Sequence, residues 1–110
     1  MVINKGYMSG SSNLLVLNLL SKKPCYGYEL IKTLKGRSND VFDMKEGTLY
    51  PILHKLENEE LITSTNQEVS GRVRKVYSIT KKGLQILEAE REEWKVFSLA
   101  VNQVLSLGGV

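Results

Sequence analysis

The chain has 110 residues, of which 42% are hydrophobic and 25% charged, and this length and composition are typical of one soluble globular domain. Its single cysteine, Cys25, excludes an intramolecular disulfide and a cysteine-based zinc site within one chain, and it fits a reducing compartment. The net charge of +3, with a sequence pI near 9.0, is compatible with a polyanionic partner but does not by itself indicate one.

The sequence contains no segment that predicts insertion into a membrane. The longest apolar run, Leu14–Leu20, is interrupted by Asn18 and is far too short to span a bilayer. Residues 1–13 lack the basic-then-apolar layout and the small-residue cleavage site of a signal peptide. We therefore expect a cytoplasmic protein. Because so short a chain buries only part of the surface that its unfolded form exposes, a second subunit would add stability.

Two helices are predicted in the first third of the chain. The first covers Asn13–Ser21, has apolar residues on nearly every face and is therefore expected to be buried on most sides, and Pro24 ends it. The second covers about Tyr26–Lys35, with Gly36 as its stop signal. The polar stretch that follows, Arg37–Asp43, is predicted to be a loop.

A third helix is predicted at about Glu46–Glu59. Its large aliphatic side chains recur at i, i+3, i+4 and i+7, which predicts one stripe facing the core. These residues are Leu49, Ile52, Leu53 and Leu56. The opposite face is cationic and hydrogen-bonding. It carries Lys45, Thr48, Pro51, His54, Lys55 and Asn58, with Tyr50 at its border.

Two strands follow, Leu61–Glu68 and Val73–Thr80, of which the second is rich in residues that favour strands. The four residues between them, Val69–Arg72, predict a hairpin tip in which Gly71 takes a positive φ. This hairpin concentrates positive charge, with three cations within four residues. They are Arg72, Arg74 and Lys75.

A long last helix is predicted from Lys81 to about Leu107, with Thr80 as its cap. Apolar residues form one stripe along it, which Arg91 interrupts. The stripe consists of Leu84, Leu87, Trp94, Phe97, Val101 and Val104. We expect two subunits to associate through its residues Leu87, Trp94, Phe97, Val101 and Val104.

Helix, helix, helix, hairpin and long helix is the order of a winged helix-turn-helix module with a C-terminal dimerisation helix. The predicted fold class is therefore α+β, mainly helical, with a two-stranded wing. We expect residues 1–80 to form the DNA-binding domain and residues 81–110 the dimerisation helix, in one compact unit. Charge is segregated in the same way, since residues 1–87 have a net charge of +5 and residues 88–110 a net charge of −2.

Each feature also has an ordinary interpretation. A polar helix face is often merely solvated, and an arginine-rich hairpin tip is often only a soluble turn. Their occurrence together, in the winged-helix order, favours binding to double-stranded DNA. His54 alone is interpreted as a surface or DNA-facing side chain, and Cys25 as a packing residue because no base lies beside it.

Three segments resemble the PadR family of bacterial transcriptional regulators. Tyr26–Leu30 resembles the start of the family's second helix, and Glu46–Glu57 is similar to its recognition-helix motif. Gly71–Tyr77, followed by Thr80 and Gly83, resembles its wing and the entry to its last helix. One departure is Glu60, where the family commonly has glycine; it affects the turn after the recognition helix and should not change function.

The short length and the segment Glu92–Lys95 resemble the PadR subgroup with a single C-terminal helix. In multidrug-responsive members of that subgroup, flat aromatic compounds bind in a pore at the centre of the dimer. The resemblance implies that Trp94 stacks on such an effector, together with Phe97 and the residues Met8, Asn13 and Leu14 near the N-terminus. The alternative, that Trp94 only packs the dimer interface, stays equally open.

The resulting hypothesis is a repressor that binds a pseudo-palindromic operator as a homodimer and is relieved by a small aromatic or phenolic ligand. Its two recognition helices would lie about one DNA turn apart. Groove contacts are expected from the polar face of the third helix, at Lys45, Thr48, Pro51, His54 and Lys55. Phosphate contacts are expected from Tyr50 and the wing cations Arg72, Arg74 and Lys75. A ligand at the dimer interface would change the angle between the two DNA-binding halves.

Two other classes of function remain as alternatives. One is a winged-helix adaptor that binds proteins, without DNA or ligand sensing, although such domains usually lack a cationic groove-facing helix. The other is an enzyme, which is the weakest interpretation because no paired acids, phosphate-binding loop or nucleophile–base spacing is present. We expect no cofactor and no metal.

Overall fold

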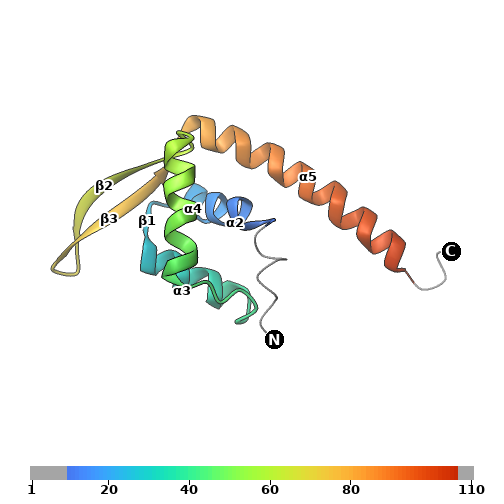
Figure 1. The fold of residues 1–110 in the computed structure, drawn as a ribbon, viewed down its shortest axis with the longest axis horizontal. Helices are drawn as coiled ribbons and strands as arrows, with labels where there is room; N and C mark the ends of the chain where they lie inside the picture. The colour runs from blue at the N-terminus through green and yellow to red at the C-terminus, as the bar shows by residue number, and fades with distance from the viewer. Residues whose placement is uncertain (1–9, 107–110) are drawn as a thin grey trace.

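The computed structural model describes residues 10–106 and contains the predicted order of helices and hairpin (Figure 1). Its elements are α2 (Ser12–Lys22), β1 (Cys25–Tyr26), α3 (Gly27–Arg37), α4 (Glu46–Asn58), β2 (Ile62–Val69), β3 (Arg72–Ile79) and α5 (Lys81–Leu105). The α+β winged-helix class with a long C-terminal helix is therefore confirmed. No helix in the described part combines the length and apolar character needed to cross a bilayer.

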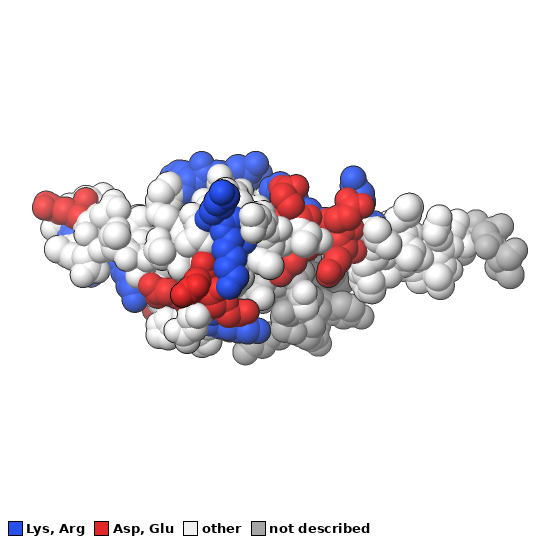
Figure 2. Space-filling model, turned by 90° about the horizontal axis from the view of Figure 1, so that it is seen from above, with Lys and Arg blue, Asp and Glu red and all other residues white. Residues whose placement is uncertain are grey.

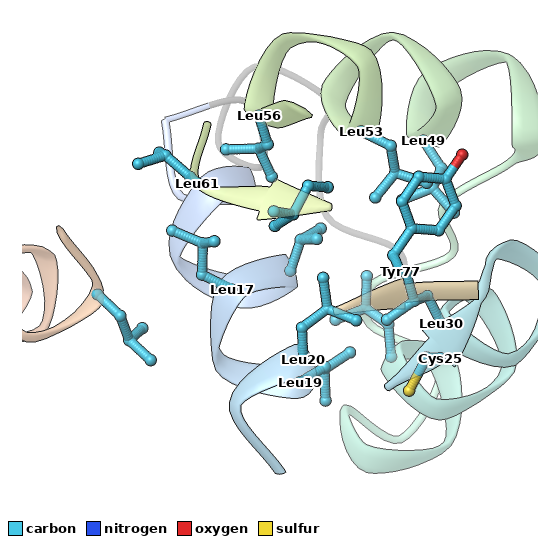
Figure 3. Close-up of a cluster of buried hydrophobic side chains, with 14 of the residues drawn as sticks. Leu17, Leu19, Leu20, Cys25, Leu30, Leu49, Leu53, Leu56, Leu61 and Tyr77 are labelled. Atoms are coloured by element: carbon cyan, nitrogen blue, oxygen red, sulfur yellow. The ribbon is translucent and has the colours of Figure 1, made fainter. Parts of the chain in front are cut away.

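The core lies where α2, α3 and α4 meet the inner part of the sheet (Figure 3). Leu17 of α2 and Leu53 and Leu56 of α4 are completely buried, and the ring of Tyr77 from β3 packs among the leucines. The predicted apolar stripe of α4 is confirmed, because three of its four residues are buried and Ile52 is half-buried. This packing holds the polar face of α4 outward.

The sheet has three strands, in the order β1-β3-β2, and all neighbours are antiparallel. The two-stranded wing was predicted, but β1 was not. Tyr26 was expected at the start of a helix, whereas it pairs with Val76 in β3 and caps the N-terminus of α3. A two-residue strand shows no alternating pattern, so only its distant partner β3 defines it.

The end of α3 also differs from the prediction. The helix continues through Gly36 to Arg37, and the backbone N–H of Ser38 donates to the carbonyl oxygen of Leu34. The chain then turns at Asn39 and Asp40, whose φ angles are 51° and 66°. Asn and Asp tolerate this left-handed region better than other non-glycine residues, and they end the helix where glycine was expected to.

The tip of the wing confirms the predicted turn. Val69 pairs with Arg72, which leaves Ser70 and Gly71 as a two-residue loop. Both loop residues have positive φ, 53° and 79°, as in the turns that match the twist of a hairpin.

Thr80 joins α4, the wing and α5. Its backbone N–H donates to the carbonyl oxygen of Leu61 (3.0 Å), and its hydroxyl donates to the carbonyl oxygen of Glu60 (2.8 Å). The same hydroxyl accepts the N–H of Gly83 (3.0 Å), which confirms the predicted cap of α5. Glu60 has a φ of 63°, a conformation that glycine adopts without strain and that explains the glycine of the PadR pattern.

The first part of α5 packs against α2 and buries Leu87, and the rest of the helix extends away from the molecule (Figure 1). Among the described residues, one side-chain hydrogen bond connects the middle of α5 to α2. The guanidinium of Arg91 donates it to Oδ1 of Asn18. Arg91 also pairs with Glu88 at 2.8 Å. The arginine that interrupts the apolar stripe therefore serves as a tie between α5 and α2.

We expect Gly83→Ala to lower the free energy of unfolding by about 3 kcal/mol or more. An added Cβ would overlap the carbonyl oxygen of Leu61 and lie 2.7 Å from Cγ1 of Ile79, and backbone cannot move away cheaply. Gly36→Ala is the matched control, because a Cβ there meets no atom within 4 Å and should raise the same free energy by up to about 1 kcal/mol. Urea denaturation at one fixed protein concentration measures both, and equal effects would contradict the analysis.

Candidate nucleic-acid interface

The exposed face of α4 gathers the residues that were predicted to enter a DNA groove. Pro51, His54 and Lys55 are exposed and Thr48 is half-buried, while the opposite side of the helix packs into the core. Neither His54 nor Lys55 makes an ion pair with any of the residues described. The face therefore presents side chains whose polar groups are available to a partner.

Lys45 lies at the N-cap of α4 and differs from the other predicted groove residues. Its Nζ lies 3.1 Å from a carboxylate oxygen of Asp43. Because this neighbour offsets its charge, Lys45 is a weaker attractor for a polyanion than Lys55.

Tyr50 lies at the edge of the same helix, against the start of α3. A Cβ at Gly27 would lie 2.6 Å from the Tyr50 hydroxyl oxygen, so a larger residue there would require the Tyr50 ring to shift. The glycine of the Tyr26–Leu30 motif thus allows the Tyr50 side chain of α4 to lie against the start of α3.

The three wing cations do not share one face. Side chains alternate along a strand, so Arg72 and Arg74 point to one side of β3 and Lys75 to the other. Lys75 Nζ lies 3.9 Å from Glu57 Oε1 and 5.7 Å from the centre of the Tyr77 ring. The structure therefore separates Lys75 from the two arginines with which it was grouped.

Glu57 is a residue that the sequence analysis did not assign. It lies on α4 and accepts a 2.6 Å hydrogen bond from the hydroxyl of Ser64 in β2, in addition to its ion pair with Lys75 in β3. Both wing strands are thus tied to the recognition helix through one carboxylate. No sequence pattern indicated this contact, because roles were predicted for the cationic and polar residues of the third helix and none for its acidic ones.

Arg74 has a different environment from Arg72. Its guanidinium carbon lies 4.5 Å from the centre of the Tyr26 ring, whereas Arg72 is exposed beside the hairpin tip. Tyr26, like Glu57, is therefore a residue beside the candidate interface that the sequence analysis did not assign.

The predicted dimer and ligand residues fall into two groups. Leu87 has 1% of its surface exposed and packs in the core of the chain, so any partner could cover little of it. Trp94, Phe97, Val101 and Val104 are exposed on the part of α5 that extends from the module. Trp94 and Phe97 are neighbours, with ring centres 6.0 Å apart.

The remaining ligand candidates are on or near α2, where Asn13 and Leu14 are half-buried. Met8 lies outside the described residues. An open, shallow and largely apolar patch on α5 is lined by Phe97 and by Glu92, Glu93, Val96 and Ala100, but not by Trp94. Phe97 thus belongs both to an aromatic pair with Trp94 and to this open patch on α5.

Charge is distributed unevenly along the molecule. In the view of Figure 2, residues of both signs cover the winged-helix module and the first part of α5, whereas the tapering end of α5 is uncharged. The sequence agrees, because no charged residue follows Lys95. The two ends of the molecule therefore suit different kinds of partner.

Cys25 is buried in β1, and its surroundings argue against a chemical role. Burial raises the pKa of its thiol from 9.0 to about 11, with a smaller contribution from the carboxylate of Glu29. The reactive thiolate is therefore disfavoured at neutral pH. Over residues 10–106, no three histidine, cysteine or acidic side chains come together as a metal site.

Comparison with known proteins agrees with this geometry. A model described as the transcriptional regulator PadR-like family matches residues 16–89. An uncharacterized protein X of Lysinibacillus sphaericus is 34% identical over 94 residues, which cover 84% of this chain and 86% of that protein. The transcriptional regulator YqjI of Escherichia coli (strain K12) is 34% identical over 84 residues, which cover 76% of this chain but only 39% of YqjI.

Solved structures give the same result. The crystal structure of a PadR-like transcriptional regulator from Bacillus cereus strain ATCC 14579 superimposes with a TM-score of 0.83 at 34% identity. The match covers 94% of this chain and 99% of the other.

Proposed function

Because the chain belongs to the PadR-like family of transcriptional regulators, we propose that it acts as a repressor that binds a pseudo-palindromic operator as a homodimer. The observation that carries this proposal is the outward polar face of α4 with a cationic wing beside it, both held on one rigid core. Residues 1–80 would bind the DNA and residues 81–110 would join the subunits.

In this proposal the α4 face enters the major groove, with Thr48, Pro51, His54 and Lys55 next to base edges and Lys45 at the margin. An exposed helix of 13 residues has the size that this groove accepts. Phosphates would be held by Tyr50, Arg72 and Arg74. Lys75 has a secondary part, because its contact with Glu57 would have to loosen before it reached the DNA.

The proposed homodimer rests on the far half of α5. Phe97 and Val96 each have 61% of their surface exposed, Val104 has 84% and Leu105 has 70%. A helix with apolar residues on most sides is stable only when it is buried against another element. A second copy of the same helix would cover these side chains and would hold two recognition helices at a fixed separation.

We also propose that the dimer responds to a small planar aromatic effector. The neighbouring rings of Trp94 and Phe97 offer a stacking surface that stays exposed within one subunit. An effector would release the DNA only if it bound more tightly to the arrangement of subunits that does not fit the operator.

The double variant Lys55→Ala/Arg72→Ala should bind the DNA upstream of the encoding gene roughly tenfold or more weakly. The slope of log affinity against log salt should fall in magnitude by about one to two, because fewer phosphates are neutralised. Fluorescence anisotropy of a labelled duplex measures both quantities. Lys95→Ala is the control, because it removes a cation from α5 and should leave the slope unchanged. If the double variant binds with wild-type affinity and slope, Lys55 and Arg72 do not contact the DNA.

Phe97→Asp should convert the dimer into monomers at low micromolar concentration, because a carboxylate would replace an apolar ring inside the subunit interface. Sedimentation equilibrium measures the change. Lys95→Asp is the control, since two positions along a helix place its side chain on nearly the opposite side. A wild-type chain that sediments as a monomer at tens of micromolar would rule out the proposed dimer.

A planar aromatic dye should quench the emission of Trp94 in a saturable way. Trp94 is the single tryptophan of the chain, so the signal has one source. The Trp94→Phe variant, followed through the fluorescence of the dye itself, should bind more weakly because a smaller ring stacks less well. Unchanged emission across a broad panel of dyes would leave Trp94 with a packing role alone.

A further inference from the structure

Arg74 and Tyr26 meet on one face of the three-stranded sheet. Tyr26 is directly opposite Val76, so Arg74, two residues before Val76 on β3, is its diagonal neighbour. The guanidinium carbon lies 4.5 Å from the ring centre of Tyr26, which is within the range of a cation–π contact. The short strand β1 thus brings an aromatic ring beneath a wing cation.

The guanidinium of Arg74 contacts the Tyr26 ring, but one of its nitrogens lacks a hydrogen-bond partner among the described residues. Its Nε atom is buried and has no hydrogen-bond partner among the residues that the structure describes. A buried donor without an acceptor is unfavourable, and because Nε is covered, a phosphate would have to bind the terminal nitrogens of the guanidinium. A planar guanidinium matches the oxygens of a phosphate, and a ring that fixes its plane also fixes the direction from which a phosphate can bind.

The other two predicted phosphate contacts, Tyr50 and Arg72, have different surroundings. The Tyr50 hydroxyl lies against Gly27, the residue that follows Tyr26. Tyr50 comes from α4, which lies on the side of β3 that carries Lys75 and Tyr77, so it does not share a face of the sheet with Arg74. Arg72, by contrast, is exposed, has no such ring contact and must be ordered by the DNA itself.

We propose that Tyr26 is a positioning residue for DNA binding. Its ring holds the Arg74 guanidinium in the orientation in which it can donate hydrogen bonds to a backbone phosphate at the base of the wing. This inference rests on the proposed function. It assigns Tyr26 no contact with a base. It also assigns the two wing arginines different parts, with Arg74 preorganised and Arg72 ordered on binding.

The test is a double-mutant cycle on the full chain, with the labelled duplex from upstream of the encoding gene as the probe. Tyr26→Leu removes the ring but keeps a residue that fits a strand, and it should weaken binding about three- to tenfold. In a chain that already carries Arg74→Ala, the same change should have almost no effect. Tyr26→Phe keeps the ring and should bind like wild type.

Two further measurements separate positioning from a structural role. Tyr26→Leu keeps the charge of Arg74, so its salt slope should match wild type, whereas Arg74→Ala should lower the slope by about one. The effects of Tyr26→Leu and Arg72→Ala should simply add, because Arg72 does not touch the ring. Circular dichroism and urea denaturation identify any variant whose loss of binding reflects loss of folding.

The outcomes are distinguishable. If Tyr26→Leu weakens binding equally with and without Arg74, or leaves affinity unchanged in a folded protein, the positioning role is wrong while DNA binding stands. If the wild-type chain binds neither this duplex nor an unrelated one, the proposed function fails and the role of Tyr26 fails with it.

Discussion

The geometry of this molecule depends on the joint around Thr80. One hydroxyl donates to the end of the turn after α4 and accepts from the first turn of α5, while the backbone N–H of the same residue closes the base of the wing. Gly83 lets α5 approach the carbonyl of Leu61 at this point, and Lys82 donates to the carbonyl oxygen of Glu59. The recognition helix, the wing and the long helix therefore share one anchoring point.

The second fixed relation is that between the wing and the recognition helix, and it comes from Glu57. A carboxylate on α4 accepts a hydrogen bond from Ser64 and lies 3.9 Å from Nζ of Lys75, so both strands contact the helix through Glu57. Arg72 and Arg74 remain on the other face of β3. One side of the wing thus fixes its orientation and the other side is left for a partner, which follows directly from the alternation of side chains along a strand.

Local patterns predicted most of the fold. The stripe from Leu49 to Leu56 located α4 and its outward face, and the residues around Gly71 located the hairpin, because helix period and turn geometry are encoded by neighbours in sequence. What the sequence did not reveal depends on distant partners. β1 exists through Val76 and Tyr77, and Leu87 belongs to the buried core of the chain. The division between Arg74 and Lys75 depends on Tyr26 and Glu57.

The length of α5 turns the Thr80 joint into the pivot of a lever. Its 25 residues extend over about 37 Å at the usual rise per residue, so a tilt of about 5° at the base displaces the far end by about 3 Å. The tie from Arg91 to Asn18 braces this arm roughly at its middle and limits such a tilt. A small change in the tilt of α5 near Arg91 therefore produces a larger displacement at the C-terminal end of the helix. A force on that end is transmitted to the winged-helix module as torque.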